Sequence, residues 1–117
     1  MMVESRRALR RNLDRPVPVV DLMTGKTVGR LSNLSETGML LGSSVSLNED
    51  ALYQLRFNLD TPGGSETAIN VGAQVLWLGS ANTPGHGWAG IRFLSISDRD
   101  LVALRRWIEP LPGATSD

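Results

Sequence analysis

Strict alternation of apolar and polar side chains is the feature that most limits what this chain can fold into. Apolar residues occupy every second position from Tyr53 to Leu59, and the positions between them are polar. A second alternating row runs from Val71 to Trp77. A period of two is that of a β-strand with one buried face. The two rows therefore predict two half-buried strands, separated by a loop at 60–65.

The other apolar segments are short and are separated by turn residues. We expect further strands at 15–23, 27–34, 39–41 and 88–94. A tight turn at Thr24-Gly25-Lys26 would join the first two of these into a hairpin. About six short strands with turn signals between them are typical of a small closed antiparallel barrel. The predicted fold is therefore a mainly β protein with a small β-barrel.

The hydrophobic period changes near the end of the chain. Apolar residues recur there at helical spacing, at Leu101, Leu104, Trp107 and Ile108. Ser97 is a suitable N-cap, and Pro110 would end the helix. The sequence thus predicts one domain: a flexible basic N-terminal arm at 1–14, a barrel with a C-terminal α-helix at 15–110, and a frayed tail at 111–117.

Charge and composition limit the class of partner. Twelve basic and twelve acidic residues cancel, which disfavours a DNA or RNA partner. Five of the eleven arginines nevertheless lie within residues 1–15, and this local excess suits a compact anionic ligand. The chain has no cysteine, so thiol chemistry and disulfides are excluded. It has no apolar leader and no segment of bilayer length, so we expect a cytoplasmic protein without membrane insertion.

Two polar segments carry candidate binding chemistry. The first is Arg6-Arg7-Ala8-Leu9-Arg10-Arg11, in which the spacing RxxxR occurs in two registers. A guanidinium donates paired hydrogen bonds to a phosphate or to the edge of guanine, and its flat face stacks on a base. The second is the turn Asn33-Leu34-Ser35-Glu36-Thr37-Gly38. Its amide and hydroxyl can bond to a guanine edge, and its glycine permits a positive φ or a close approach to the ligand.

The RxxxR and [D/N]xSxxG pair, in this order and followed by a barrel pattern, resembles the PilZ domain family over residues 5 to 108. The resemblance implies a receptor or adaptor that binds cyclic di-GMP, needs no cofactor or metal, and signals to an unidentified protein partner in processes such as motility or biofilm formation. It assigns ligand-binding roles to Arg6, Arg7, Arg10, Arg11, Asn33, Ser35, Gly38 and Trp77. The Arg6/Arg10 register is preferred, because Leu13 and Pro16 then stand at the family's positions.

The tryptophans and glycines have competing interpretations. Trp77 fits either a core position or a base-stacking one, whereas Trp88 and Trp107 fit the core. The run G-x-G-x-x-G at 85–90 is followed by a strand pattern and not by a helix, so it predicts a hairpin turn and a crowded strand instead of a dinucleotide fingerprint.

No sequence feature indicates catalysis. His86, the only histidine, stands in a Pro-Gly loop without a partner carboxylate or nucleophile, and we expect no enzyme. The main alternative function is a PilZ-fold adaptor, for example in type IV pilus assembly or motility, that does not bind nucleotide. An RNA-binding small barrel is disfavoured by the neutral charge and the few aromatic residues.

Overall fold

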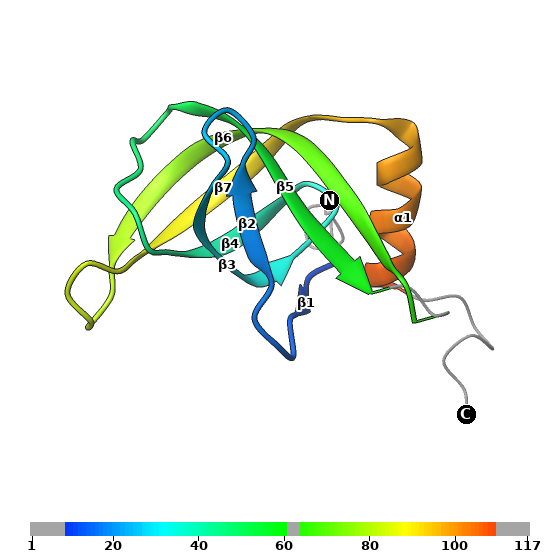
Figure 1. Cartoon of the computed structure of the whole chain (residues 1–117), viewed down its shortest axis with the longest axis horizontal. Coiled ribbons are helices and arrows are strands. Elements are labelled where there is room, and N and C mark those ends of the chain that lie inside the picture. Colours follow the sequence, from blue (N-terminus) through cyan, green and yellow to red (C-terminus); the bar gives the residue numbers. More distant parts are fainter. Residues whose placement is uncertain (1–8, 61–63, 110–117) are drawn as a thin grey trace, which may run out of the picture.

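Six antiparallel strands close into a barrel, and one further short strand extends it (Figure 1). The computed structural model describes residues 9–60 and 64–109. The strands are β1 Arg11–Asn12, β2 Pro18–Asp21, β3 Lys26–Leu34, β4 Gly38–Ser43, β5 Leu52–Asp60, β6 Glu66–Ser80 and β7 Gly87–Ile96. Their order around the barrel is β3-β2-β5-β6-β7-β4, and pairing between β3 and β4 closes it. The predicted barrel is confirmed.

The short strand β1 belongs to the predicted arm. It pairs with the end of β3, with Asn12 opposite Asn33, on the same edge of β3 where β2 pairs with the earlier residues of that strand. The Leu13 N–H also donates to the Ser32 carbonyl at 3.1 Å. Part of the segment 1–14 is therefore attached to the barrel by its backbone. Residues 1–8, like the predicted tail at 111–117, lie outside the described residues.

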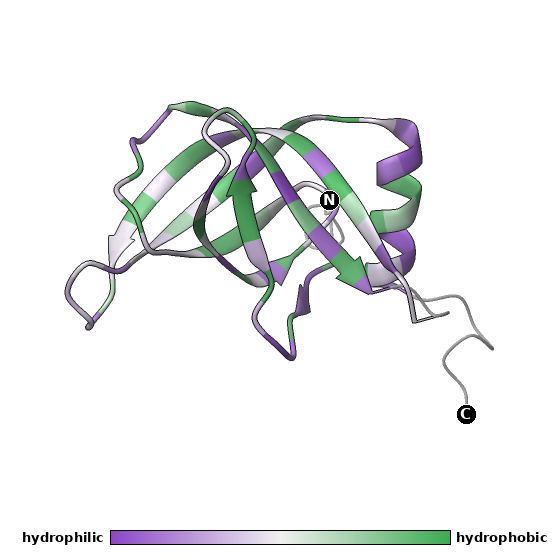
Figure 2. Cartoon of the chain, viewed as in Figure 1, coloured by the Kyte–Doolittle hydropathy of each residue, from purple (hydrophilic) through white to green (hydrophobic). Residues whose placement is uncertain are grey.

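The alternating rows form the core as predicted. On β5 the side chains of Leu55, Phe57 and Leu59 are buried, while the residues between them are exposed. Figure 2 shows this alternation as bands of colour along β5. The predicted hairpin at Gly25 is also confirmed, since this glycine has a φ of 77°, in the left-handed region.

The C-terminal helix α1, Asp98–Ile108, lies against β5 and β6 beside one end of the barrel (Figure 1). The Ser97 side chain caps it by accepting from the Asp100 N–H. Leu104 is fully buried, and Trp107 and Ile108 pack against the core. The predicted cap and apolar face of this helix are confirmed.

The core position predicted for Trp88 was wrong, and the core alternative for Trp77 is excluded as well. Trp88 is 39% exposed, and Trp77 is 46% exposed despite its place in an alternating row. The reason for Trp77 is a register shift between Val75 and Trp77, where β6 holds one more residue than β7. Such a bulge interrupts the alternation and turns the following side chain to the other face. Both indoles therefore lie on the outside of the barrel.

Candidate functional site

The two predicted polar segments meet at one point. The Arg10 side chain, just before β1, donates from Nη1 to Asn33 Oδ1 on β3 at 2.7 Å. This contact joins residues that are 23 positions apart in sequence, and the pairing of β1 with β3 makes it possible. A guanidinium has five N–H donors, so Arg10 keeps most of its donors for another group.

An open pocket of about 300 Å³ lies beside this contact. It is lined by Arg10, Asn33, Met39, Leu40, Leu76, Trp77, Gly90 and Ile91. The residues come from the position just before β1 and from strands β3, β4, β6 and β7. The pocket therefore combines a cation, an amide, an aromatic ring and an apolar wall, which is the usual make-up of a small-molecule site.

The Trp77 indole lies directly on the backbone of Gly90. A Cβ added at Gly90 would stand 2.0 Å from the indole Nε1 and 2.3 Å from Cε2. Any larger residue at this position would have to push the ring away. Gly90 is thus part of the pocket. The sequence placed Gly90 in a crowded strand but did not reveal what crowds it, because Trp77 is its cross-strand partner.

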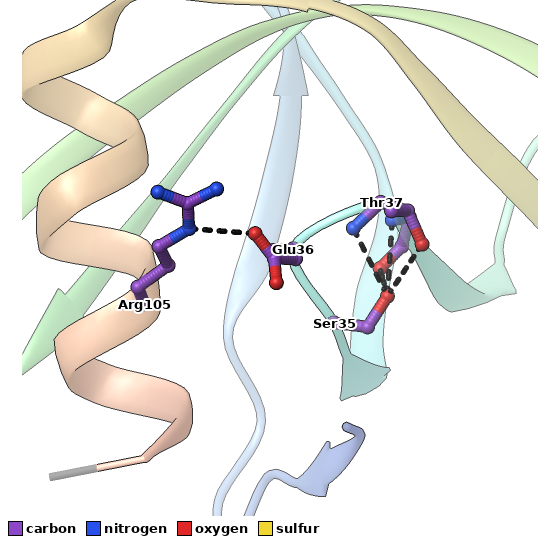
Figure 3. A network of polar contacts seen from close by, with 5 residues as sticks. Ser35, Glu36, Thr37 and Arg105 are labelled. Atoms are coloured by element: carbon purple, nitrogen blue, oxygen red, sulfur yellow. Dashed lines mark hydrogen bonds and ion pairs between the residues drawn. The ribbon is translucent and has the colours of Figure 1, made fainter. Parts of the chain in front are cut away.

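Ser35 and Gly38 contact other parts of the barrel, and neither residue lines the pocket. The fully buried Ser35 Oγ accepts from the backbone N–H groups of Thr37 and Gly38, both at 3.2 Å (Figure 3). Gly38 does not have a positive φ. A Cβ there would stand 2.2 Å from the Ile91 carbonyl oxygen, so glycine allows the close approach of β4 to β7. These two motif residues shape the turn that presents Asn33.

Arg11 points to the helix and not to the pocket. Its guanidinium lies over the Trp107 ring, 4.2 Å from the ring centroid, and donates to the Trp107 carbonyl. A cation at the C-terminal end of a helix is favoured by the helix dipole. Neighbouring arginines of the arm thus have different partners, whereas Arg6 and Arg7 lie outside the described residues.

The motif turn also contacts the helix. Glu36 Oε1 accepts from Arg105 Nε at 2.6 Å, across the gap between the turn and α1 (Figure 3). Both side chains are more than a third exposed, so this ion pair alone is a weak tether. Together with the Arg11–Trp107 contact, it connects each polar segment to α1.

Comparison with known proteins identifies the family. The PilZ domain matches residues 4–109, nearly the whole chain. The chain belongs to the PilZ domain family. Among curated protein sequences, none matches it. This PilZ domain nevertheless keeps both polar segments in the order that the family resemblance predicted.

Solved structures show the same fold. An inhibitor of motility from Bacillus subtilis, MotI/DgrA, is 15% identical with a TM-score of 0.72, over 91% of this chain and 50% of that protein. YcgR from Escherichia coli in complex with c-di-GMP is 25% identical with a TM-score of 0.66, over 86% of this chain and 43% of that protein. The separate PilZ domain of YcgR with c-di-GMP is 23% identical with a TM-score of 0.65, over 88% of each chain. This PilZ domain thus spans half or less of the two longer proteins.

Metal-ligating clusters, the histidine and membrane-spanning helices can be assessed in the described part of this PilZ domain. Residues 9–60 and 64–109 contain no group of three histidine or acidic side chains that could hold a metal ion. His86 is exposed, and its Nδ1 lies 3.3 Å from the Pro84 carbonyl oxygen. Within the same residues, no helix is long and apolar enough to cross a membrane.

Proposed function

We propose that this PilZ domain is a binding module and not an enzyme, and that its ligand is cyclic di-GMP. The observation that supports this is the Arg10–Asn33 contact at 2.7 Å, where both family motifs meet at the edge of a pocket walled by Trp77. The ligand of the YcgR structures is the same nucleotide. The expected cytoplasmic location is part of this proposal.

Each pocket residue has a role in the proposed complex. The Arg10 guanidinium donates to a ligand phosphate or to the O6/N7 edge of guanine. The exposed face of the Trp77 indole stacks on a guanine base. Asn33 holds Arg10 in place and offers its amide to the base. We propose Arg6 as the second arginine of the pair, with Arg7 as an additional contact.

The size of the pocket limits how much of the ligand it can hold. Small-molecule pockets run from about 300 to 1,000 Å³, so at about 300 Å³ this one is at the lower end of the range. A cyclic dinucleotide carries two bases and two phosphates. The pocket therefore takes one base and its neighbouring phosphate, and the rest of the ligand extends over the outer face of the barrel.

We propose that the bound nucleotide orders the Arg-rich arm and that α1 passes the signal to a partner protein. Arg11 and Asn12 already pair with β3, so the ordering concerns Arg10 and the residues before it. Because Arg11 contacts Trp107, a change in the arm alters the contacts of α1. Backbone amide relaxation with and without ligand tests this step. Order parameters that rise in the arm alone support it, and equal values in both states contradict it.

Titration calorimetry with cyclic di-GMP, up to high micromolar ligand, tests the binding itself. The matched control is Arg56→Ala, because Arg56 is an exposed arginine on β5 whose Nε donates to Asn70, away from the pocket. We expect heat with the wild type and with Arg56→Ala, and a loss of binding with Arg10→Ala. The absence of heat with the wild type would contradict the receptor proposal and favour the adaptor that binds no nucleotide.

A further inference from the structure

A second pocket opens on the outer face of the barrel, beside the one already described. Its volume is about 390 Å³, and it lies between the segment 13–16 and strands β3, β4 and β7. Trp88, Gly42 and Arg30 lie side by side in it, because Gly42 on β4 pairs with Arg30 of β3 on one side and with Trp88 of β7 on the other.

Trp88 lies beside a glycine of a neighbouring strand, as Trp77 does, but in looser contact. A Cβ added at Gly42 would stand 3.6 Å from Trp88 Cζ3, so the indole edge reaches over the glycine. The two tryptophans also meet at Gly79, where an added Cβ would stand 3.5 Å from the Trp77 ring and 3.9 Å from Trp88 Cβ. The two exposed tryptophans thus extend from the same outer face of the barrel, and each ring contacts the position of a glycine on a neighbouring strand.

The charged groups around Trp88 are cationic with one exception. Among the residues that the structure describes, the Arg30 side chain makes no hydrogen bond or ion pair. Arg15 is held by Asp60, with the two side chains 2.5 Å apart. Asp14 is the one acidic residue in the lining. Arg30 therefore keeps all its donors beside an open aromatic face, a combination suited to a base that carries a phosphate.

We propose that Trp88, Gly42 and Arg30 form a second stacking subsite for the purine base of a nucleotide. Trp88 stacks on the base, and Arg30 donates to the edge of the base or to the attached phosphate. Gly42 leaves room for the Trp88 indole. The inference rests on the proposed function, because it extends the nucleotide site beyond the pocket at Trp77. The first pocket holds only part of a dinucleotide, so a second base needs a place on this face. That base is either the second guanine of the same ligand or a guanine of a second ligand molecule.

Calorimetry of the Trp88→Ala variant with cyclic di-GMP is the direct test. We expect an affinity about fivefold to a hundredfold lower, or one fewer ligand bound, since each stacked base contributes about 1–3 kcal/mol. Trp88→Phe should restore most of the loss, because phenylalanine keeps an aromatic face. The control is Leu94→Ala, which removes another exposed apolar residue of β7 outside this lining. Thermal unfolding of each variant separates a loss of binding from a loss of fold.

The number of ligands bound identifies the source of the second base. One ligand in the wild type, with weaker binding in Trp88→Ala, assigns both bases to one molecule. Two ligands in the wild type and one in Trp88→Ala assign the second base to a second molecule. Either result supports the subsite. If the wild type binds and Trp88→Ala matches it in affinity and stoichiometry, the subsite is wrong while the proposed function stands. If the wild type does not bind, both are overturned.

A spectroscopic readout reports on the ring itself. In the variant Trp77→Phe/Trp107→Phe, Trp88 is the only tryptophan left. Stacking of a base on Trp88 changes its fluorescence on addition of cyclic di-GMP, and adding Gly42→Leu, whose side chain fills the space under the ring, should remove this change. Unchanged emission at saturating ligand, shown by calorimetry on the same sample, would contradict the proposal.

Discussion

The pocket and the helix are contacted by the same two segments through different residues. Before β1, Arg10 reaches the pocket, while the next residue, Arg11, reaches Trp107 of α1. In the motif turn, Asn33 lines the pocket and Glu36 pairs with Arg105 of α1. The segment before β1 and the motif turn therefore each contact both the pocket and α1, but they do so with different side chains. Ligand binding and its transmission to α1 should accordingly be separable by single substitutions.

The largest difference in ligand affinity is expected between variants of Arg10, in the pocket, and of Arg105, on α1. Arg10→Ala should weaken cyclic di-GMP binding more than tenfold, because a hydrogen bond to a charged group contributes about 1.5–3 kcal/mol. Arg6→Ala should have an effect of the same size. Arg105→Ala, which removes an arginine of α1, should leave the affinity within twofold. Calorimetry measures all three. If Arg11→Ala and Arg7→Ala are the damaging pair instead, the register assigned to RxxxR is wrong.

The next effect concerns the stability of the turn that follows Asn33. Ser35→Ala should lower the free energy of unfolding by about 1–3 kcal/mol, because two backbone N–H groups lose their acceptor in a buried turn. Chemical denaturation measures this, and the exposed Ser44 supplies the control Ser44→Ala. We expect a smaller loss of binding, through displacement of Asn33. A variant as stable as the wild type would show that water replaces the hydroxyl.

A smaller effect on stability is expected at the helix contact. Arg11→Ala should lower the free energy of unfolding by about 1 kcal/mol, from the lost contact with Trp107. This corresponds to a decrease in Tm of about 4–8 °C for a domain of this size. Arg99→Ala, at an exposed arginine of the same helix, is the control. An Arg11→Ala variant with unchanged Tm and tenfold weaker binding would place Arg11 in the ligand site. The pocket and the contact with α1 would then not be separate.

The smallest effect is expected at Asn33. Asn33→Asp should keep the affinity for cyclic di-GMP or raise it severalfold, because a carboxylate accepts a stronger, charge-assisted bond from Arg10 and holds it in place. Calorimetry at two salt concentrations checks this, with Asn58→Asp on β5 as the charge control. A tenfold loss would mean that residue 33 faces a ligand phosphate, which a carboxylate repels.

Much of this fold could be predicted from local patterns. The alternation on β5, the tight turn at Gly25 and the Ser97 cap depend on a few neighbouring residues, and each was confirmed. The two motifs also led to the right family. Their ligand-binding roles stay predictions, although the structure brings Arg10, Asn33 and Trp77 to one pocket. The Ser35 hydroxyl accepts from two backbone N–H groups inside the turn, and its predicted contact with the ligand also stays a prediction.

Only the tertiary structure decided which way the tryptophans and arginines point. One extra residue in β6 turns Trp77 outward, and that bulge exists only in the pairing of β6 with β7. Gly90 and Gly42 became meaningful once their cross-strand neighbours were known. The sequence determined strands β2 to β7, the turns and the helix, because these follow from conformational preferences over a few residues, whereas β1 exists only through its pairing with β3. The faces of Arg10 and Arg11, and the two exposed indoles, depend on contacts between segments far apart in the chain, and no local pattern encodes them.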